Sequence, residues 1–497
     1  FNRISAISAN KKTLTLEDMA NVSQVCDGSV TSGAVIVPFV LGVPKIKNEE
    51  NSFLYAKLGH ENVASIDLSK TNLITYQQVS GKSTDGNGDL TVTISDTGLS
   101  EGFFEGFDVE RYSVSYNNGS SIVALKADQV SFNTDSTEIT IGGLLTNQTN
   151  VVVNVTVKKT NIRSKTKKYQ RSRKLTVSKT NSNSKILENG LTKNSYFGLR
   201  VEDEVISLNT IDAVKLVAVY ESLDQSDAVL DSLTFLSTLK LDLSAIAGEK
   251  VRGLTSGAIA QVVSGTSAST IDIVKLNQFN FEIGETVVYE ESGIQAILQD
   301  ITKGKYLDRT TNYRLDKGHR HQLLDYSRII RESGGAPSRR LTVIFDRYET
   351  PSNDTGDIYT VNSYSKERYS TDIPVLEDGT RCSDIIDVRP QLADFDPTNT
   401  YSPFSFKART SNPASNTNNS ILSPNENTLI GYSYYLPRID KLVLHKDGEF
   451  KLIQGTPELE PKEPNLIEDG MHVATMSLPA YLYNPDDVTI ILKDNRR

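Results

Sequence analysis

Short segments that alternate apolar and polar residues recur along the chain, and turn residues separate them. Val151–Val157 shows the period of two that places successive side chains on opposite faces of a strand. Asn-Gly and Gly-Asn-Gly stretches at 117–119 and 86–88 supply tight turns. Five such strands are expected, at 89–96, 111–116, 120–126, 137–144 and 150–159. Their spacing predicts an immunoglobulin-like β-sandwich over 72–178.

Length and composition agree with a chain made of strands. A chain of 497 residues can form several domains, each with its own core. Thr, Ser, Asn, Val and Ile are abundant, whereas there are only three Met and no Trp. Strands and turns use the abundant types more readily than helices do. The sequence therefore predicts a mainly β, multi-domain protein with long loops.

A repeat with a shift of 36 residues is the clearest internal signal. GEKVRGLTSGAIAQVV begins at Gly248, and GETVVYEESGIQAILQ begins at Gly284. Identical residues recur in register at Gly248/Gly284, Glu249/Glu285, Val251/Val287, Ser256/Ser292, Gly257/Gly293 and Ala260/Ala296. Each copy predicts a hairpin whose Ser-Gly turn needs a positive φ, which a β-branched residue would not tolerate. We expect a module of two packed hairpins within 246–303, with an architectural role.

Composition shifts divide the remainder of the chain. We expect an N-terminal β segment at 1–71, with strands at 11–19 and 32–41 and no run long enough to span a bilayer. Three more units are expected: strands at 179–245 that complete the N-terminal domain, a β domain at 304–455, and a C-terminal part at 456–497. The β domain should hold strands at 338–349 and 356–365, a long polar excursion at 390–428 and a hairpin at 432–455. Three prolines make 456–465 an extended arm that we expect to lie across a neighbouring protein.

Charge and cysteine content narrow the function. A net charge of −9 argues against a nucleic-acid-binding protein, because phosphate affinity depends on Lys and Arg. The tract 158–174 nevertheless holds nine Lys or Arg and no acid. An anion-binding arm is one interpretation, but we favour a solvated strand pair or a patch that docks onto an acidic protein surface. Charge reversal at Lys165, Lys167 and Lys168 is then expected to weaken assembly or to do nothing. Cys26 and Cys382 are expected to be buried thiols rather than a disulfide.

The sequence offers few candidates for an active site. It contains no phosphate-binding glycine loop, no GxSxG and no HExxH. Asp85–Asp89 resembles half a calcium loop, but Asp96 stands where a bidentate Glu is needed, so a hairpin turn is favoured. His60, His445 and His472 occur singly. We assign no catalytic, cofactor-binding or metal-binding residue and expect no enzyme, although a hydrolase with two carboxylates in a groove stays an alternative.

His319 and His321 are the one pair that invites a metal-site interpretation. Alternate spacing places both rings on one face, but a third ligand would have to come from a distant segment. We favour a structural segment in which Asp316 and Asp325 pair with Arg320 and Arg328. Replacing both histidines by alanine should then leave the fold intact.

Several ordered blocks of this chain resemble the large tail structural proteins of contractile-tailed myoviruses, in particular T-even-like phages of marine cyanobacteria. The blocks include YFGLRVEDEVISLN, YRLDKGHRHQLLDYSRI, APSRRLTVIFDRYE, YYLPRIDKLVLHKDGEFKLIQG and the terminal LKDNRR. Within 316–322 the family has Asp-x-Gly-Gln-Arg-Asp, so His319 and His321 depart from its pattern, which speaks against a family-wide metal role. The terminal DNRR resembles a point where such proteins continue, and we expect a piece of a longer chain.

The resemblance implies a virion structural protein of the phage tail, assembled in the cytoplasm of the host bacterium. We expect a baseplate wedge or fibre-anchoring subunit that contacts other tail and baseplate proteins and further copies of itself, with more than about 2,000 Å² buried. It implies no cofactor, no nucleic acid and no membrane insertion. The alternative is a receptor-binding tail fibre or adhesin that recognises host surface polysaccharide.

Overall fold

The structure is a computed structural model, and it describes residues 54–493 with several gaps. The gaps are 117–120, 180–195, 237–245, 268, 352, 367–368, 370–371, 410–420, 424–425 and 483. Nearer the N-terminus it describes a hairpin of β1 (Ile4–Ile7) and β2 (Leu14–Leu16), and β2 falls within the strand expected at 11–19. The strand expected at 32–41 and Cys26 lie outside the described residues.

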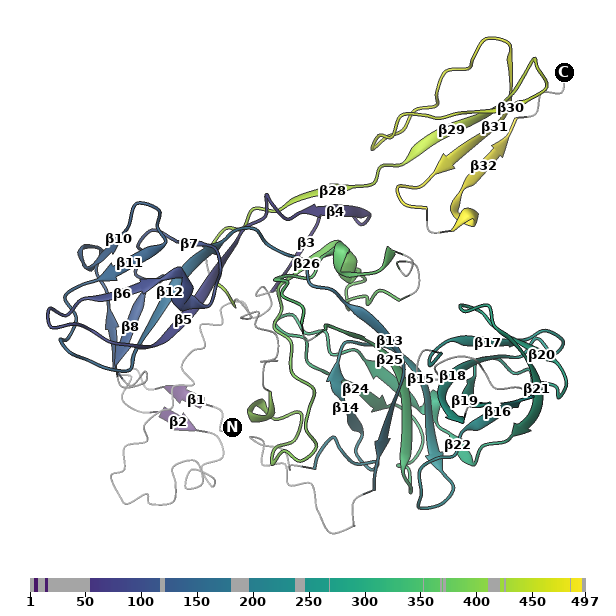
Figure 1. The fold of residues 1–497 in the computed structure, drawn as a ribbon, viewed down its shortest axis with the longest axis horizontal. Coiled ribbons are helices and arrows are strands. Elements are labelled where there is room, and N and C mark those ends of the chain that lie inside the picture. Colours follow the sequence, from purple (N-terminus) through teal and green to yellow (C-terminus); the bar gives the residue numbers. More distant parts are fainter. Residues whose placement is uncertain are drawn as a thin grey trace.

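The prediction of a mainly β protein with several units is confirmed. The strands form a sandwich, a central unit, a closed barrel and a C-terminal sheet (Figure 1). The helical elements of the described residues are single 3₁₀ turns such as η3 (Ile94–Thr97). No helix in this part of the chain is both long and apolar enough to cross a membrane.

The sandwich extends from β5 (Leu73–Lys82) to β12 (Val151–Lys159). One sheet has the order β10-β11-β6, and the other has the order β27-β5-β12-β8-β9, with β7 also paired to β12. The other strands of these two sheets are β6 (Leu90–Thr93), β7 (Phe103–Phe104), β8 (Ser113–Tyr116), β9 (Ser121–Ala124), β10 (Val130–Phe132), β11 (Glu138–Ile141) and β27 (Ile421–Leu422). Valines of β12 and isoleucines of β11 fill the core between the sheets. The strands expected in this region are therefore confirmed.

The central unit takes strands that we had expected elsewhere. Its larger sheet has the order β13-β25-β15-β22, and β14-β24-β23 form the second sheet. These strands are β13 (Lys168–Val177), β14 (Val205–Ile211), β15 (Ala213–Ser222), β22 (Tyr306–Asp308), β23 (Tyr313–Asp316), β24 (Tyr326–Arg331) and β25 (Leu341–Glu349). β13 pairs with β25 rather than within the sandwich, and β14 and β15 pair with β24 and β25 rather than with an N-terminal domain. Local alternation marks a strand but does not specify its partner.

Each copy of the repeat forms an antiparallel hairpin, as predicted. The first copy gives β17 (Lys250–Gly253) and β18 (Ile259–Ser267), and the second gives β20 (Thr286–Tyr289) and β21 (Gln295–Thr302). β17 pairs with β20, and β16 (Asp231–Phe235) with β19 (Thr270–Lys275) closes the barrel. The module is thus larger than the 246–303 expected from the repeat. Gly257 and Gly293 have φ values of 66° and 69°, which confirms the need for glycine in both turns.

The two repeat copies exchange a glutamate, which explains why Glu249 and Glu285 recur. The carboxylate of Glu285 accepts hydrogen bonds from the backbone N–H groups of Thr255 and Ser256, at 3.2 and 3.0 Å. Glu249 accepts from the equivalent N–H groups in the second copy, those of Glu291 and Ser292, at 2.8 and 2.5 Å. Both carboxylates are buried. Each copy therefore caps the turn of the other, and a hydrogen-bonded carboxylate is tolerated in the interior.

Strands from late in the chain return to pair with its beginning. β26 (Ile385–Asp387) pairs with β3 (Tyr55–Lys57), and β28 (Gly431–Tyr434) pairs with β4 (Val63–Asp67). Two of our expectations for the β domain at 304–455 are wrong. Residues 356–365 form isolated bridges and the turn η6 (Val361–Ser363) rather than a strand. The segment 390–409 is not an exposed excursion, because Leu392, Phe395 and Ala408 are buried against Tyr326.

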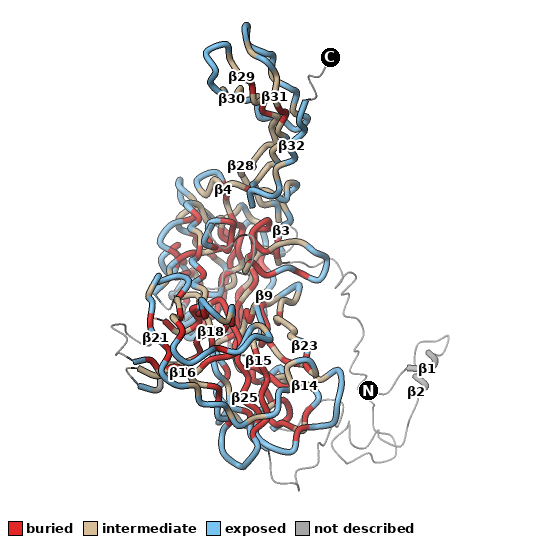
Figure 2. The backbone as a smooth tube through the Cα atoms, turned by 90° about the vertical axis from the view of Figure 1, so that its right-hand side faces the viewer, coloured by how far each residue is buried: buried red, intermediate tan, exposed pale blue. Residues whose placement is uncertain are grey.

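The C-terminal sheet has the order β30-β29-β31-β32 and stands away from the other units (Figures 1 and 2). β29 (Arg438–His445) and β30 (Phe450–Ile453) form the hairpin that Asp447-Gly448 predicts. β31 (Gly470–Leu478) and β32 (Thr489–Leu492) complete it. The proline-rich arm 456–465 folds back on this sheet, with Lys441 Nζ 2.8 Å from the Pro464 carbonyl oxygen and 2.9 Å from Glu463. The arm therefore has contacts within its own chain, while most of its residues are exposed, and its expected contact with a neighbouring protein stays a prediction.

Candidate functional site: a buried polar junction

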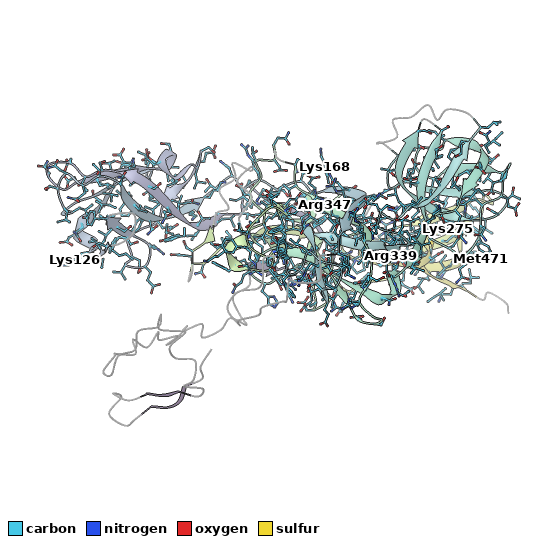
Figure 3. All side chains as sticks on the ribbon, turned by 90° about the horizontal axis from the view of Figure 1, so that it is seen from below. Lys126, Lys168, Lys275, Arg339, Arg347 and Met471 are labelled. Carbon is cyan, nitrogen blue, oxygen red and sulfur yellow. The ribbon has the colours of Figure 1, made fainter. Side chains whose placement is uncertain are left out.

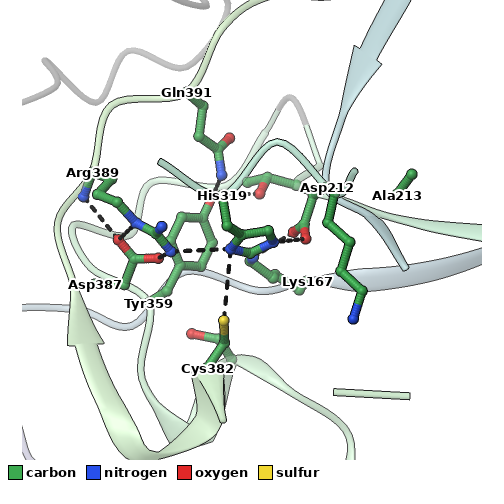
Figure 4. A network of polar contacts seen from close by, with 12 residues as sticks. Lys167, Asp212, Ala213, His319, Tyr359, Cys382, Asp387, Arg389 and Gln391 are labelled. Atoms are coloured by element: carbon green, nitrogen blue, oxygen red, sulfur yellow. Dashed lines mark hydrogen bonds and ion pairs between the residues drawn. The ribbon is translucent and has the colours of Figure 1, made fainter. Parts of the chain in front are cut away.

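His319 belongs to a cluster of buried polar side chains that are linked by hydrogen bonds and ion pairs (Figure 4). We name this cluster the polar junction and define it as Lys167, Asp212, His319, Cys382, Asp387 and Arg389. Lys167 directly precedes β13, and Asp212 is the single residue between β14 and β15, with a positive φ of 57° that Asp tolerates better than most residues. Cys382 begins η8 (Cys382–Asp384), and Asp387 ends β26. Side chains from well-separated parts of the sequence thus meet at one point.

Lys167 is the buried cation of the polar junction. Its ammonium forms an ion pair with Asp212, and the two side chains are 1% and 3% exposed. Three tyrosine rings surround the same ammonium, with centroids 4.6 Å (Tyr359), 5.3 Å (Tyr364) and 5.9 Å (Tyr348) from Nζ. The negative faces of these rings add to the attraction of the carboxylate. Burial of the charge is therefore offset by a partner and an aromatic cage.

Asp212 holds its charge through two partners. Burial favours the neutral acid, but the charge of Lys167 and the hydrogen bond with His319 outweigh it and lower the pKa of the Asp212 carboxyl below its ordinary value. Nε2 of His319 lies 3.0 Å from Oδ1 of Asp212. On its other side, Nδ1 of His319 lies 3.2 Å from Nη2 of Arg389. Because arginine can only donate, we assign the ring proton to Nε2, which then donates to Asp212.

Arg389 and Asp387 form the second ion pair of the polar junction. Their closest atoms are 2.7 Å apart, and both side chains are essentially inaccessible to solvent. Asp387 also accepts the backbone N–H of Arg389, and Arg389 donates to the carbonyl oxygen of Arg320 at 2.9 Å. The largest influence on the pKa of Asp387 is burial, which raises it, but Arg389 reverses this and lowers the pKa below its ordinary value. The pair connects β26 to the loop that carries His319.

Cys382, His319 and Asp212 are the residue types of a cysteine nucleophile with its base and orienting acid. Sγ of Cys382 lies 3.7 Å from Nδ1 of His319. However, Cys382 is only 1% exposed, and Arg389 donates to the same Nδ1. A nucleophile must reach its substrate and needs a base that is free to take its proton. The arrangement favours a structural cross-link, and Cys382 is the free, buried thiol that the sequence predicts.

Both histidines line one cavity beside the polar junction, although the segment is a loop rather than a strand. The cavity has a volume of about 500 Å³, and Tyr55, Arg320, Leu376, Glu377, Asp378 and Arg389 complete its wall. His321 is exposed there, with the Tyr55 hydroxyl 3.3 Å from its Nδ1. The side chain of His319 is only 5% exposed. The expectation that the fold survives replacement of both histidines stays a prediction, although the buried, hydrogen-bonded His319 is the one whose loss would cost stability.

The charged pairs expected around this loop are present. Arg320 lies 2.5 Å from Asp316, and Arg328 lies 3.3 Å from Asp316 and 3.2 Å from Asp325. Arg409 adds an unforeseen third cation, 2.9 Å from Asp325. This confirms the structural interpretation of 316–328. No three metal-ligating side chains of His, Cys, Asp or Glu come together within the described residues.

The basic tract 158–174 is solvated only in part: Arg163, Arg173 and Lys174 are exposed, as expected for a solvated strand pair, but other cations of the tract are not. Lys165 and Lys167 are buried, and Lys159 forms an ion pair with Asp357. Lys168 is exposed. Asp357, Asp212 and Glu291 pair with Lys159, Lys167 and Arg171, so acids far along the chain neutralise part of this run of like charge. Charge reversal at Lys167 would therefore disrupt the fold itself.

The other sequence candidates have local roles. Asp85 accepts the backbone N–H groups of Asn87 and Asp89, both at 2.8 Å, which confirms a turn. The turn is not a hairpin, because β5 and β6 belong to different sheets. His60 stacks on Tyr434, with ring centroids 3.5 Å apart, and His445 lies 2.6 Å from Asp447.

Comparisons of this chain with protein-family models, with curated proteins and with solved structures found no match. The class of protein that the fold defines is a mainly β protein with several sheets and a small closed barrel.

Proposed function

We propose that the chain is a non-catalytic structural protein of a contractile phage tail. In this proposal it is a baseplate wedge or fibre-anchoring subunit that acts through contacts with other tail proteins and with copies of itself. The ordered sequence blocks that resemble tail proteins support this assignment.

The structural observation that carries the proposal is the way in which the units are joined. β26 and β28, near the end of the chain, pair with β3 and β4, near the beginning of the described part. β27 adds a strand to the sandwich itself, paired with β5. Separating the sandwich from the central unit requires breaking these ladders together, whereas a single linker would separate freely. Such joining suits a subunit that must keep its shape under load.

The polar junction supports the same role. It joins β13, the β14–β15 connection, the His319 loop and β26 through charged hydrogen bonds that need defined geometry. Buried ionic groups add little net stability compared with apolar packing, but they favour one arrangement over others. We infer that the junction fixes the relative orientation of the segments that meet there.

The test is made on intact particles of the phage that encodes this chain. A phage with a stop codon in the gene, grown with and without the protein supplied in trans, should give defective tails only without it. Mass spectrometry of purified particles should find the chain in stoichiometric amounts, with a replication protein of the same phage as the background control. A chain absent from particles, or one that cleaves host polysaccharide when purified, would contradict the proposal.

A further inference from the structure

The C-terminal sheet has one face that the described residues leave uncovered. Residues paired across its four strands share a face, and Leu442 is paired with Leu452, while Ala474 is paired with both Leu442 and Leu492. The other cross-strand pairs of the sheet add further residues to the same face. The apolar face consists of Leu442, Leu444, Phe450, Leu452, Met471, Ala474, Met476, Ile490 and Leu492. We name this set the C-terminal apolar face; Met471 is labelled in Figure 3.

On the opposite face of the same sheet, β29 is covered by the chain itself, whereas Ile491 of the edge strand β32 is exposed. Lys441 lies on that face, is buried, and contacts the proline-rich arm at Pro464 and Glu463. Val443 on the same face is fully buried. The C-terminal apolar face is different, because Phe450, Ile490 and Leu492 are 65%, 57% and 74% exposed. A sheet with one partly covered and one bare apolar face has the form of half of a β-sandwich.

We propose that the C-terminal apolar face binds the same face of a second copy of this chain, as two sheets packed face to face. The inference deepens the proposed function and rests on it, because it names one contact through which a structural subunit would assemble. The occupant is a second copy for three reasons, which concern charge, area and access.

The face offers no net charge to an oppositely charged partner. Its charged members at one end, Arg438 and Asp440, lie 3.0 Å apart and neutralise each other. An uncharged, flat face with residues in register is complementary to itself, and a two-fold contact between identical patches is the commonest form of soluble oligomer. Inner faces of two sheets then interdigitate about 10 Å apart.

The area reaches the lower bound for a specific dimer contact. A large side chain offers roughly 150–250 Å², so the exposed part of this face amounts to on the order of 500 Å² per copy. Two copies would bury about 1,000 Å², the lower bound for a specific interface. The largest apolar patch of a typical monomer is about 300–600 Å² and often serves in binding, so this face is of the size of a binding patch. The sheet projects from the other units that the structure describes, so these units do not lie against it (Figures 1 and 2).

β32 supplies a matched pair of variants for the test. Ile490 and Ile491 are neighbours with the same exposure of 57%, but Ile490 is paired with Met476 on the apolar face and Ile491 with Thr475 on the opposite face. Sedimentation velocity of the purified full chain should show a dimer at micromolar concentrations. Ile490→Glu should raise the dissociation constant about 100-fold, because the interface would bury an unpaired charge. Ile491→Glu should leave it unchanged, and Leu452→Glu provides a second variant on the face. Circular dichroism checks that each variant is folded.

Three results would overturn the inference. A wild-type chain that stays monomeric across the concentration range would exclude the dimer, and a dimer that survives Ile490→Glu would place the contact elsewhere. Equal dissociation in Ile490→Glu and Ile491→Glu would show that the effect is not specific to the face. A monomeric chain that is nevertheless present in purified tails would contradict this inference alone and leave the proposed function standing.

Discussion

Lys167 shows how a charged side chain can be buried when several groups stabilise its charge. Its ammonium is shared between the Asp212 carboxylate and the rings of Tyr348, Tyr359 and Tyr364. Each group alone would compensate only part of the lost hydration. Removing the cation leaves a buried carboxylate whose remaining close partner in the polar junction is His319.

We therefore expect Lys167→Met to lower the free energy of unfolding by about 3 kcal/mol, the cost of breaking a buried ion pair. Lys168→Met, one residue away but exposed, should change it by less than about 0.5 kcal/mol. Urea unfolding followed by tyrosine fluorescence measures both, since the chain has no tryptophan. Adding Asp212→Asn to Lys167→Met should recover part of the loss, because the unpaired charge is removed. Equal stability of the two lysine variants would refute the ion-pair interpretation.

Asp346 is a buried acid that is stabilised less well than Asp212. It accepts hydrogen bonds from the Ser172 N–H at 2.8 Å and from the Gln261 side chain at 3.1 Å, and so links the central sheet to the barrel. Burial raises the pKa of its carboxyl above the ordinary 3.8, and these hydrogen bonds offset only part of the effect. A raised pKa means that the folded state disfavours ionisation.

The sign of the pH dependence follows from this shift. The contribution of the Asp346 carboxyl to the stability of the folded state is fully present below pH 3.8. It is lost as the pH rises through the raised pKa that this carboxyl has in the folded state. Asp346→Asn should therefore gain stability relative to wild type at pH 7, and the gain should shrink as the pH falls towards 4. Thermal unfolding between pH 4 and pH 8 measures this difference. Asp135→Asn, at an exposed carboxylate, is the control, and a difference that is constant with pH would contradict the prediction.

At the scale of elements, the barrel is held together by an exchange between its two repeats. Glu249 and Glu285 each cap a turn in the other copy, so the hairpins are linked by side chains as well as by the β17–β20 ladder. The register of the repeat identified these two glutamates from the sequence. Their crossed roles depend on how the hairpins dock, which no local pattern records.

Because each glutamate caps a turn in the other copy, a substitution in one copy should affect the turn of the other. Glu285→Gln should destabilise the barrel by about 1–3 kcal/mol, because one of two accepting oxygens becomes a donor. Hydrogen exchange should then quicken at the backbone amides of Thr255 and Ser256, in the first copy. Glu249→Gln should instead quicken exchange at Glu291 and Ser292 in the second copy. Glu290→Gln, at an exposed site in the same barrel, should affect neither turn. If the amides of the mutated copy itself exchanged faster, the crossed capping of the two turns would be contradicted.

The difference between local pattern and tertiary docking also decides which elements the sequence could predict. The strands of the sandwich and the hairpins of the repeat are local, and alternation with turn glycines identifies them. β13 was placed in the wrong unit because its partner β25 lies far away in sequence. Residues 356–365 alternate like a strand, but Val361 begins a 3₁₀ turn whose cap is Thr360. Pairing is a tertiary property and overrides local pattern.

At the scale of the whole molecule, the polar junction could be predicted only in part. The ion pairs beside it, of Asp316 and Asp325 with their arginines, are close in sequence, and their pairing follows from charge and spacing. Lys167, Asp212 and Cys382 gave no such signal, because a buried cluster is assembled from segments that meet only in the folded chain. His319 and the basic tract were sequence features that pointed to it, but we interpreted the tract as a surface.

The last prediction concerns how the sandwich is held to the rest of the molecule. The returning segment around β27 is anchored by Glu426, whose carboxylate receives two hydrogen bonds from Arg111 of the sandwich, at 2.5 and 3.0 Å. The pair is bidentate and partly shielded, with side chains 27% and 13% exposed, so it is stronger than an ordinary surface ion pair.

Glu426→Gln keeps one acceptor but loses the charge, and we expect it to weaken the anchor by about 1–2 kcal/mol. Because β27 and β28 follow each other in the returning segment, hydrogen exchange should quicken in both strands and in their partners β5 and β4. The barrel and the C-terminal sheet should be unaffected, since neither pairs with these strands in the described structure. Glu460→Gln, an exposed charge in the proline-rich arm, is the matched control. Faster exchange throughout the chain would show global destabilisation, whereas unchanged exchange in β4 and β28 would show that the ladders alone join the units.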